Sequence, residues 1–246
     1  MVRALGRDDQ RPGISAPAFD GPANATDAHT HFDEAHPTPL PKTKFLMLAR
    51  QEDLARLETR YDDRIGTLTV CDGEDFFETD VRTEMGRAAE NAFFARFLTD
   101  ELHGRQPRLV KGLSHRFTDV GVHSSLLMNT ISVLNLASLR DFEQKLGRTV
   151  DPRRFRMNIL VEGFCPWEEM DWLDREVVLG DVKCRSVRLT RRCPATQVHP
   201  DTPLRDIDVP KELLRLYDNV LLGVYPTVEG EGVISVGDTA TRPATK

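Results

Sequence analysis

The chain has 246 residues, of which 33 are Lys or Arg and 39 are Asp or Glu, so its formal net charge is −6 with neutral histidines. This length suits one large domain or two small ones. The acidic balance disfavours nucleic acid and anionic membranes as partners, so any anion site must be a local basic cluster. No stretch approaches the roughly 18 apolar residues of a membrane span, and the first residues lack a signal-peptide core, so a cytoplasmic protein is expected.

The cysteines and the common motifs exclude several classes of site. The four cysteines lie far apart in the sequence, at Cys71, Cys165, Cys184 and Cys193. This spacing argues against a zinc ribbon, a thioredoxin-type motif and a secreted disulfide framework. The sequence also lacks the glycine-rich dinucleotide motif, a phosphate-loop lysine, His-Glu-x-x-His and the Gly-x-Ser-x-Gly elbow, which disfavours the nucleotide-binding and serine-hydrolase classes.

Residues 1–40 are rich in Pro and Gly and hold only isolated apolar side chains. Such a segment buries too little surface to offset its ordering entropy, so a flexible tail is predicted there. It contains His29, His31 and His36, but no further ligand at a fixed spacing, and we predict no metal site. Residues 241–246 are predicted to form a second tail.

Residues 41–110 are predicted to form a shortened N-terminal region of strands and helices. The apolar run at 45–48 suits a buried strand, and Leu54, Leu57 and Tyr61 keep helical spacing. A strand at 67–70 would run into the Asp72-Gly73 turn. Apolar residues up to Leu98 then recur with helical spacing after Thr83, a good N-cap residue, so an amphipathic helix is expected.

The rest of the chain mixes helices with short strands. Ser132 precedes Leu136, Leu139, Phe142 and Leu146, which keep helical spacing, and Gly147 stands where a left-handed C-cap belongs, so a helix is expected there. A second helix is expected at 209–217. Strands separated by turn signals are predicted at 155–161, 176–179, 182–189, 220–228 and 233–236. This spacing predicts an α+β, mainly β fold, with an antiparallel barrel-like sheet and peripheral helices.

The first candidate site is Cys193, which five basic residues precede between Lys183 and Arg192 with no acid among them. Nearby guanidinium groups favour a thiolate, and the thiolate is the form that acts as a nucleophile or soft-metal ligand. Pro194 ends the strand, so the sulfur is expected at a barrel rim. The alternative from composition alone is a surface strand with solvated arginines and a buried, inert cysteine.

A second basic group contains Arg154, Arg156 and Asn158, which period-two alternation places on one face of a strand. Guanidinium groups bind phosphate in bidentate fashion, and an Asn amide can offer both a donor and an acceptor to a heterocycle. These three side chains are therefore a candidate anion site. The alternative is that the arginines pair with carboxylates such as Glu168 or Asp171.

Several segments taken in order resemble one family. They include an Arg-Cys-x-x-Thr element and lie at 154–159, 167–168, 171–172, 179–182, 192–196, 200–202, 223–225 and 234–238. This set is similar to the MOSC family, the molybdenum cofactor sulfurase C-terminal domain, and suggests a stand-alone bacterial-type member. The resemblance implies a MOSC-type antiparallel β-barrel with peripheral helices over residues 111–240.

The resemblance also implies a site around Cys193. In relatives that bind the pterin molybdenum cofactor (molybdopterin), the matching cysteine ligates molybdenum, while the residues matching Arg156 and Asn158 hold the pterin and its phosphate. Further candidates on or beside matching elements are Arg154, Arg191, Arg192, Thr196 and Ser124.

Three functions follow from this resemblance. The first is an oxidoreductase that reduces N-oxygenated compounds at a Cys-ligated molybdenum and receives electrons from a redox partner. The second is a sulfur-carrier or cofactor-binding module in which a cysteine desulfurase supplies a Cys193 persulfide, without independent turnover. The third is a structural remnant with a buried Cys193.

The sequence departs from fuller family members before Thr43. Those members have Pro-Val-Lys-Ser-like and Asp-Arg-Arg-like segments that help to enclose the cofactor, and neither is found here. No pyridoxal phosphate sulfurase domain is recognised either. The tail could take the place of these segments, a partner chain could complete the pocket, or the cofactor could be absent. The substrate and the oligomeric state are not predicted.

Overall fold

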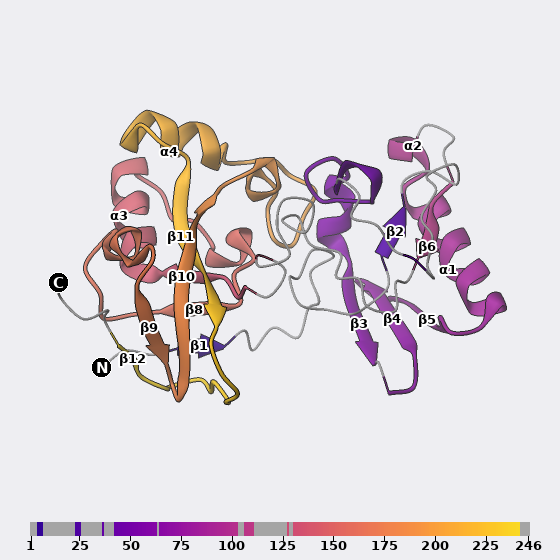
Figure 1. The fold of residues 1–246 in the computed structure, drawn as a ribbon. Coiled ribbons are helices and arrows are strands. Elements are labelled where there is room, and N and C mark those ends of the chain that lie inside the picture. Colours follow the sequence, from indigo (N-terminus) through magenta and orange to yellow (C-terminus); the bar gives the residue numbers. More distant parts are fainter. Residues whose placement is uncertain are drawn as a thin grey trace. The chain divides into compact units, whose positions relative to one another are not determined.

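The computed structural model describes residues 4–6, 23–25, 36, 42–62, 64–102, 106–110, 127 and 130–241. The chain divides into two compact units (Figure 1). The first consists of Met1–Asp9, Asn129–Gln197 and Asp206–Lys246, and the second of Gln10–Met128 and Val198–Arg205. None of the helices in the described ranges has both the length and the apolar character needed to cross a bilayer.

The first unit is built on a seven-stranded sheet, with the long strands β10 and β11 side by side at its centre (Figure 1). In spatial order the strands are β1 (Ala4–Gly6), β8 (Ile159–Val161), β7 (Val133–Asn135), β11 (Leu221–Val228), β10 (Val182–Arg191), β9 (Glu176–Leu179) and β12 (Ala240–Thr241). All neighbours are antiparallel except β7 and β8, which run parallel. The predicted α+β, mainly β class with a barrel-like sheet is therefore confirmed, with one parallel pair. In the described residues β1 and β12 are its two edges.

Two helices of this unit end at well-formed caps. Helix α3 (Leu136–Leu146) begins where the Asn135 side chain accepts from the Ala137 N–H, and it ends at Gly147 with φ 78°. Helix α4 (Val209–Tyr217) begins at Asp208, whose side chain accepts from the N–H of Lys211. Polar side chains at the first position and a left-handed residue at the last satisfy groups that a helix leaves without partners. Both predicted helices are thus confirmed.

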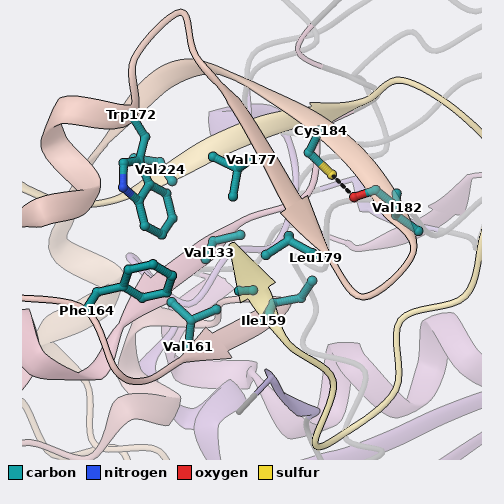
Figure 2. Close-up of a cluster of buried hydrophobic side chains, with 11 residues drawn as sticks. Val133, Ile159, Val161, Phe164, Trp172, Val177, Leu179, Val182, Cys184 and Val224 are labelled. Atoms are coloured by element: carbon teal, nitrogen blue, oxygen red, sulfur yellow. Dashed lines mark hydrogen bonds between the residues drawn. The ribbon is translucent and has the colours of Figure 1, made fainter. Parts of the chain in front are cut away.

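Apolar side chains of the first unit form two buried clusters. One packs α3 and α4 against the sheet and includes Leu134, Phe142 and Leu222. The other is shown in Figure 2, where the rings of Phe164 and Trp172 meet edge to face with their centroids 4.8 Å apart. Successive residues of β7 enter different clusters, as the alternation of a strand requires.

Two strand predictions in the first unit need correction. The strand expected at 155–161 begins only at Ile159, because Pro152–Phe155 forms the short 3-10 helix η4. Asp151 is the N-cap of that helix and Pro152 is its first residue. This pair is a helix-start signal, and it outweighs the strand-like alternation of the residues that follow. No strand forms at 233–236, and the sheet gains its last strand at β12 instead.

The second unit contains a three-stranded antiparallel sheet and a two-stranded one. Its strands are β3 (Glu58–Asp62), β4 (Thr67–Asp72) and β5 (Asp75–Asp80), with β2 (Ala23–Ala25) paired to β6 (Arg108–Val110). Helix α1 (Glu84–Phe97) begins at Thr83, whose hydroxyl accepts from the Gly86 N–H, as the sequence predicts. The shorter elements are α2 (Thr99–Leu102), η1 (Lys42–Lys44) and η2 (Glu52–Arg56).

Two predictions in the second unit are wrong. The helical spacing of Leu54, Leu57 and Tyr61 spans two elements, because η2 ends at Arg56 and strand β3 follows. The apolar run at 45–48 is not a strand, since the chain turns there and the N–H of Arg50 donates to the carbonyl of Met47 at 2.9 Å. Spacings of three and four residues do not identify a helix when the run is this short.

Strands β1 and β2 lie within residues 1–40, which the composition predicts to be a flexible tail. β1 pairs with β8, placing Ala4 opposite Val161, and β2 pairs with β6, placing Ala23 opposite Val110. His29 and His31 lie outside the described residues, and His36 is exposed. The domain boundaries proposed from the sequence stay predictions.

A polar junction joins α3, α4 and the segment before the 3-10 helix η5 (Glu168–Trp172). Asp141 Oδ2 accepts from Trp167 Nε1 and from the Tyr217 hydroxyl, each at 2.7 Å, and lies 3.2 Å from Lys145 Nζ. Partial burial alone would raise the pKa of Asp141, but these donors outweigh it and lower that pKa below its ordinary value. The carboxylate therefore binds these elements most tightly when it is ionised.

Replacing Asp141 by asparagine is expected to reduce the free energy of unfolding at pH 7 by about 1–3 kcal/mol, because charged hydrogen bonds become neutral or are lost. A lowered pKa in the folded state gives stability that is present above the unfolded pKa of about 4 and is lost as the pH falls through the folded value. Urea unfolding at pH 7 and between pH 5 and pH 2 measures both effects. The free energy of unfolding of Asp141→Asn should fall less steeply as the pH is lowered than that of the parent protein. Asp171 is exposed, so Asp171→Asn should have the same free energy of unfolding as the parent protein at each pH. An unchanged acid profile in Asp141→Asn would contradict this assignment.

Candidate functional site

Cys193 follows Arg192 just beyond the end of β10 and directly precedes the 3-10 helix η6 (Pro194–Gln197), at the point where the chain leaves the sheet. Its thiol is free and the residue is half-buried. The Cys193 carbonyl accepts from the N–H of Thr196 at 3.0 Å and from its hydroxyl at 2.8 Å. The buried Thr196 thus fixes the main chain that carries the thiol.

Arg192, the residue before this cysteine, has a buried guanidinium. Its Nε and Nη2 donate to the carbonyl of Leu222, and its Nη1 donates to the carbonyl of Phe155 at 3.2 Å. Nη2 also lies 3.1 Å from the sulfur of Met157. Arg192 therefore fastens the end of β10 to β11 and to the segment that precedes β8, rather than facing solvent beside the thiol.

Arg192 stays protonated although its guanidinium is buried. Removal from water lowers the pKa of Arg192 to about 10, against the opposing influence of Tyr225, Cys193 and Glu169. The side chain is thus a cation at neutral pH. It is a fixed positive charge within electrostatic reach of Cys193.

Arg156 and Asn158 flank Met157 in the segment that Arg192 holds. Met157 is buried, whereas its two neighbours are half-buried. Arg156 has a left-handed conformation with φ 53° and ends η4, so it does not belong to a strand. The predicted sharing of a strand face by Arg154, Arg156 and Asn158 is therefore wrong. The link through Arg192 to Phe155 and Met157 ties this segment to the strand end that carries Cys193.

Arg154 makes an internal ion pair. The residue is 4% exposed, its Nη2 is 2.5 Å from Asp206 Oδ1, and its Nη1 donates to the carbonyl of Gln197 at 3.1 Å. Burial would raise the pKa of Asp206, but the hydrogen bond and charge of Arg154 lower it overall. Arg154 therefore pairs with a carboxylate, as the alternative interpretation of the sequence predicts. That partner is Asp206, which is far away in the sequence, and not Glu168 or Asp171.

The side chain of Asn158 is held by Ser132. The Ser132 N–H and hydroxyl each donate to Asn158 Oδ1 at 2.8 Å, and the Asn158 N–H donates to the Ser132 hydroxyl at 2.9 Å. The sequence pattern places Ser132 before a helix and not in the site, whereas the structure places it before β7 and makes Asn135 the N-cap of α3.

The remaining candidates differ in position. Arg191 is exposed at the end of β10, opposite Leu221 of β11. Ser124 lies outside the described residues. Sequence reasoning also missed Glu169, a buried carboxylate whose Oε2 accepts from Ser138 at 2.6 Å and from Asn135 at 3.0 Å. Burial raises the pKa of Glu169, against the lowering influence of the hydrogen bonds from Ser138 and Asn135 and, more weakly, of the charge of Arg192.

The four cysteines are expected to differ sharply in reactivity. Cys184 is fully buried in the cluster of Figure 2, and burial raises the pKa of its thiol to about 11. Cys165 is exposed and Cys193 is half-buried. Because alkylation requires access and a thiolate, Cys184 should react at least about 100-fold more slowly than Cys165 in the native protein.

Peptide mass spectrometry after timed treatment with iodoacetamide measures this difference, with urea-unfolded protein as the control in which all four thiols react. Cys193 should be modified in the native protein. Equal rates for Cys184 and Cys165 would contradict the described core. An unreactive Cys193 would support the remnant alternative.

The fold and the site together define an α+β protein with a free thiol where a central strand ends, beside a buried cation. The family model of the MOSC domain matches residues 111–241, which is more than half of the chain. The chain belongs to the MOSC domain family.

Curated relatives match part of the same region. Mitochondrial amidoxime-reducing component 1 of Mus musculus is 36% identical over 118 residues, which cover 43% of this chain and 34% of the relative. The Xenopus laevis protein of that name is 29% identical over 153 residues, covering 57% of this chain and 44% of the relative. The chain thus spans less than half the length of these relatives. The crystal structure of YiiM from Geobacillus stearothermophilus aligns with a TM-score of 0.36 and 22% identity, over 47% of this chain and 54% of YiiM.

Proposed function

We propose that this chain binds the pterin molybdenum cofactor with Cys193 as the metal ligand and reduces N-oxygenated compounds with electrons from a redox partner. The observation that carries the proposal is the half-buried, free thiol of Cys193 at a fixed strand end within the MOSC region. Soft thiolates are suitable ligands for molybdenum. The substrate class follows the names of the amidoxime-reducing relatives.

The donors present at the site fit such a group. Cys193 supplies the soft ligand, Asn158 offers its amide NH2, and Arg156 and exposed Arg191 are cations for a phosphorylated, negatively charged molecule. When bound, the cofactor would supply a metal able to exchange electrons and accept an oxygen atom. Ser124 stays a proposed contact.

The other candidate residues support this arrangement through the protein. Arg154 and Arg192 direct their guanidinium groups to protein acceptors, so their proposed role is to hold the site segments together. Thr196 keeps the Cys193 carbonyl, and hence the thiol, in place. The charge of Arg192 also offsets part of the negative charge that a bound thiolate and phosphate would bring.

An activity assay tests this proposal. The protein, purified from a host that makes the cofactor, should reduce benzamidoxime to benzamidine with reduced methyl viologen as the electron donor. Cys193→Ala should lose this activity, because the metal loses its protein ligand. The matched control is Cys165→Ala, which removes an exposed thiol in a loop and should keep full activity. Absence of turnover by the parent protein, or turnover by Cys193→Ala, would reject the reductase.

A second function is supported by the same half-buried thiol. In a sulfur carrier, the Cys193 thiolate attacks the outer sulfur of a cysteine desulfurase persulfide, and the desulfurase cysteine leaves as a thiolate. Incubation with a desulfurase and cysteine should then add one sulfur atom to the mass of the Cys193 peptide. An unmodified peptide would reject the carrier. The cytoplasmic location and the choice between a redox partner and a desulfurase stay predictions.

A further inference from the structure

Ser132 makes an unusually complete set of contacts with the segment that carries Asn158. The residue is 2% exposed and stands just before β7. Besides the three hydrogen bonds to Asn158, its carbonyl accepts from the N–H of Ile159 at 3.0 Å. Ser132 thus connects the starts of two parallel strands, β7 and β8, through both its main chain and its hydroxyl.

These contacts fix the polarity of the Asn158 amide. A main-chain N–H can only donate, so the Asn158 atom that faces Ser132 must be the acceptor Oδ1. The Ser132 hydroxyl gives its single proton to the same oxygen, while its own oxygen accepts from the Asn158 N–H. Both acceptor positions of Oδ1 are therefore used, and only the NH2 group remains available. Within the described part of the chain, that NH2 meets no protein acceptor.

We infer that Ser132 determines specificity as a positioning residue: it locks the Asn158 amide so that the site presents only N–H donors to a ligand at this point. The site then selects an acceptor atom, such as a carbonyl, ring nitrogen or phosphate oxygen, and disfavours a donor. This deepens the proposed function and rests on it, since it takes Asn158 to face the bound pterin. It corrects the expectation that Asn158 offers both a donor and an acceptor.

Three variants separate this role from a general structural one. Ser132→Ala removes the hydroxyl donor to Oδ1 and the acceptor of the Asn158 N–H, so only the main-chain N–H of residue 132 still holds the amide and its hold is weakened. Ser132→Thr keeps the hydroxyl and is the conservative control. Asn158→Asp keeps an oxygen toward Ser132 but replaces the outward NH2 by a carboxylate oxygen, which repels an acceptor.

The first readout is the rate at which pterin is lost from the loaded protein during dialysis. Ser132→Ala should lose pterin about tenfold faster than the parent protein, equivalent to about 1.4 kcal/mol, and Ser132→Thr should match the parent protein. Asn158→Asp should lose pterin at least as fast as Ser132→Ala. A purely structural Ser132 would instead lower the thermal midpoint in Ser132→Ala and leave its rate of pterin loss equal to that of the parent protein.

The second readout needs no cofactor. In ¹⁵N-labelled protein the side-chain NH2 of Asn158 should give one sharp pair of resonances, which Ser132→Ala should shift or broaden and Ser132→Thr should leave in place. If the parent protein carries no pterin, the proposed function fails and these resonances alone decide whether Ser132 locks the amide. If the loaded parent protein and Ser132→Ala lose pterin equally fast, or the resonances do not change, the inference is overturned while the proposed function stands.

Discussion

Replacement of Arg192 by alanine is expected to reduce the free energy of unfolding of the first unit by about 3–5 kcal/mol. The variant leaves the buried carbonyls of Leu222 and Phe155 without this donor and removes a positive charge that interacts favourably with buried Glu169. Urea unfolding followed by tryptophan fluorescence measures the loss, because Trp167 and Trp172 both belong to this unit.

The neighbouring arginine is the matched control for this experiment. Arg191 is exposed, so Arg191→Ala should change the unfolding free energy by no more than about 0.5 kcal/mol. Arg192→Lys should recover little of the loss, since one ammonium group cannot reach the same acceptors as a planar guanidinium. Similar stabilities for Arg192→Ala and Arg191→Ala would show that Arg192 does not hold the strand end.

Gly223→Ala is expected to cost about 3 kcal/mol, combining backbone strain with a clash. Gly223 has φ 87°, and a Cβ there would lie 2.6 Å from the carbonyl oxygen of Val133 and 3.0 Å from Nη2 of Arg192. The glycine also lets Leu222 and Val224 enter different buried clusters, although residues two apart in a regular strand share a face. Urea unfolding measures the loss.

Gly147→Ala is the control that measures the cost of backbone strain without a steric clash. Gly147 has φ 78°, and a Cβ there would meet nothing within 4 Å, so its cost should be only about 1 kcal/mol. The difference between the two variants is then the cost of the clash beside Arg192. Equal losses for the two variants would contradict the close approach of β7, β11 and Arg192.

The elements that could be predicted carry local signals. Helix α3 combines an amphipathic pattern with the glycine C-cap at Gly147, and α1 begins at Thr83, so both follow from neighbouring residues. η4 also has a local signal in Asp151-Pro152, but the alternation of Arg154, Arg156 and Asn158 is equally typical of a strand. Short patterns of two kinds can coincide, and only the cap distinguishes them.

The site could be predicted less completely because its contacts join residues far apart in the sequence. One continuous segment of the sequence contains Cys193, the basic residues before it and Pro194, so this part of the site can be predicted. No local pattern shows that Arg192 is buried against Phe155 or that Arg154 pairs with Asp206. The strand β10 has two register irregularities, between Ser186 and Arg188 and between Leu189 and Arg191, so simple alternation does not predict which arginine turns inward.

The most direct test of the central claim, that Cys193 holds the molybdenum cofactor, is the amount of molybdenum and pterin per chain. The parent protein and Cys165→Ala, purified from a host that makes the cofactor, should both contain near-stoichiometric amounts. Cys193→Ala should contain almost no molybdenum. Metal-free parent protein, or a Cys193→Ala variant that keeps its full molybdenum, would contradict the account.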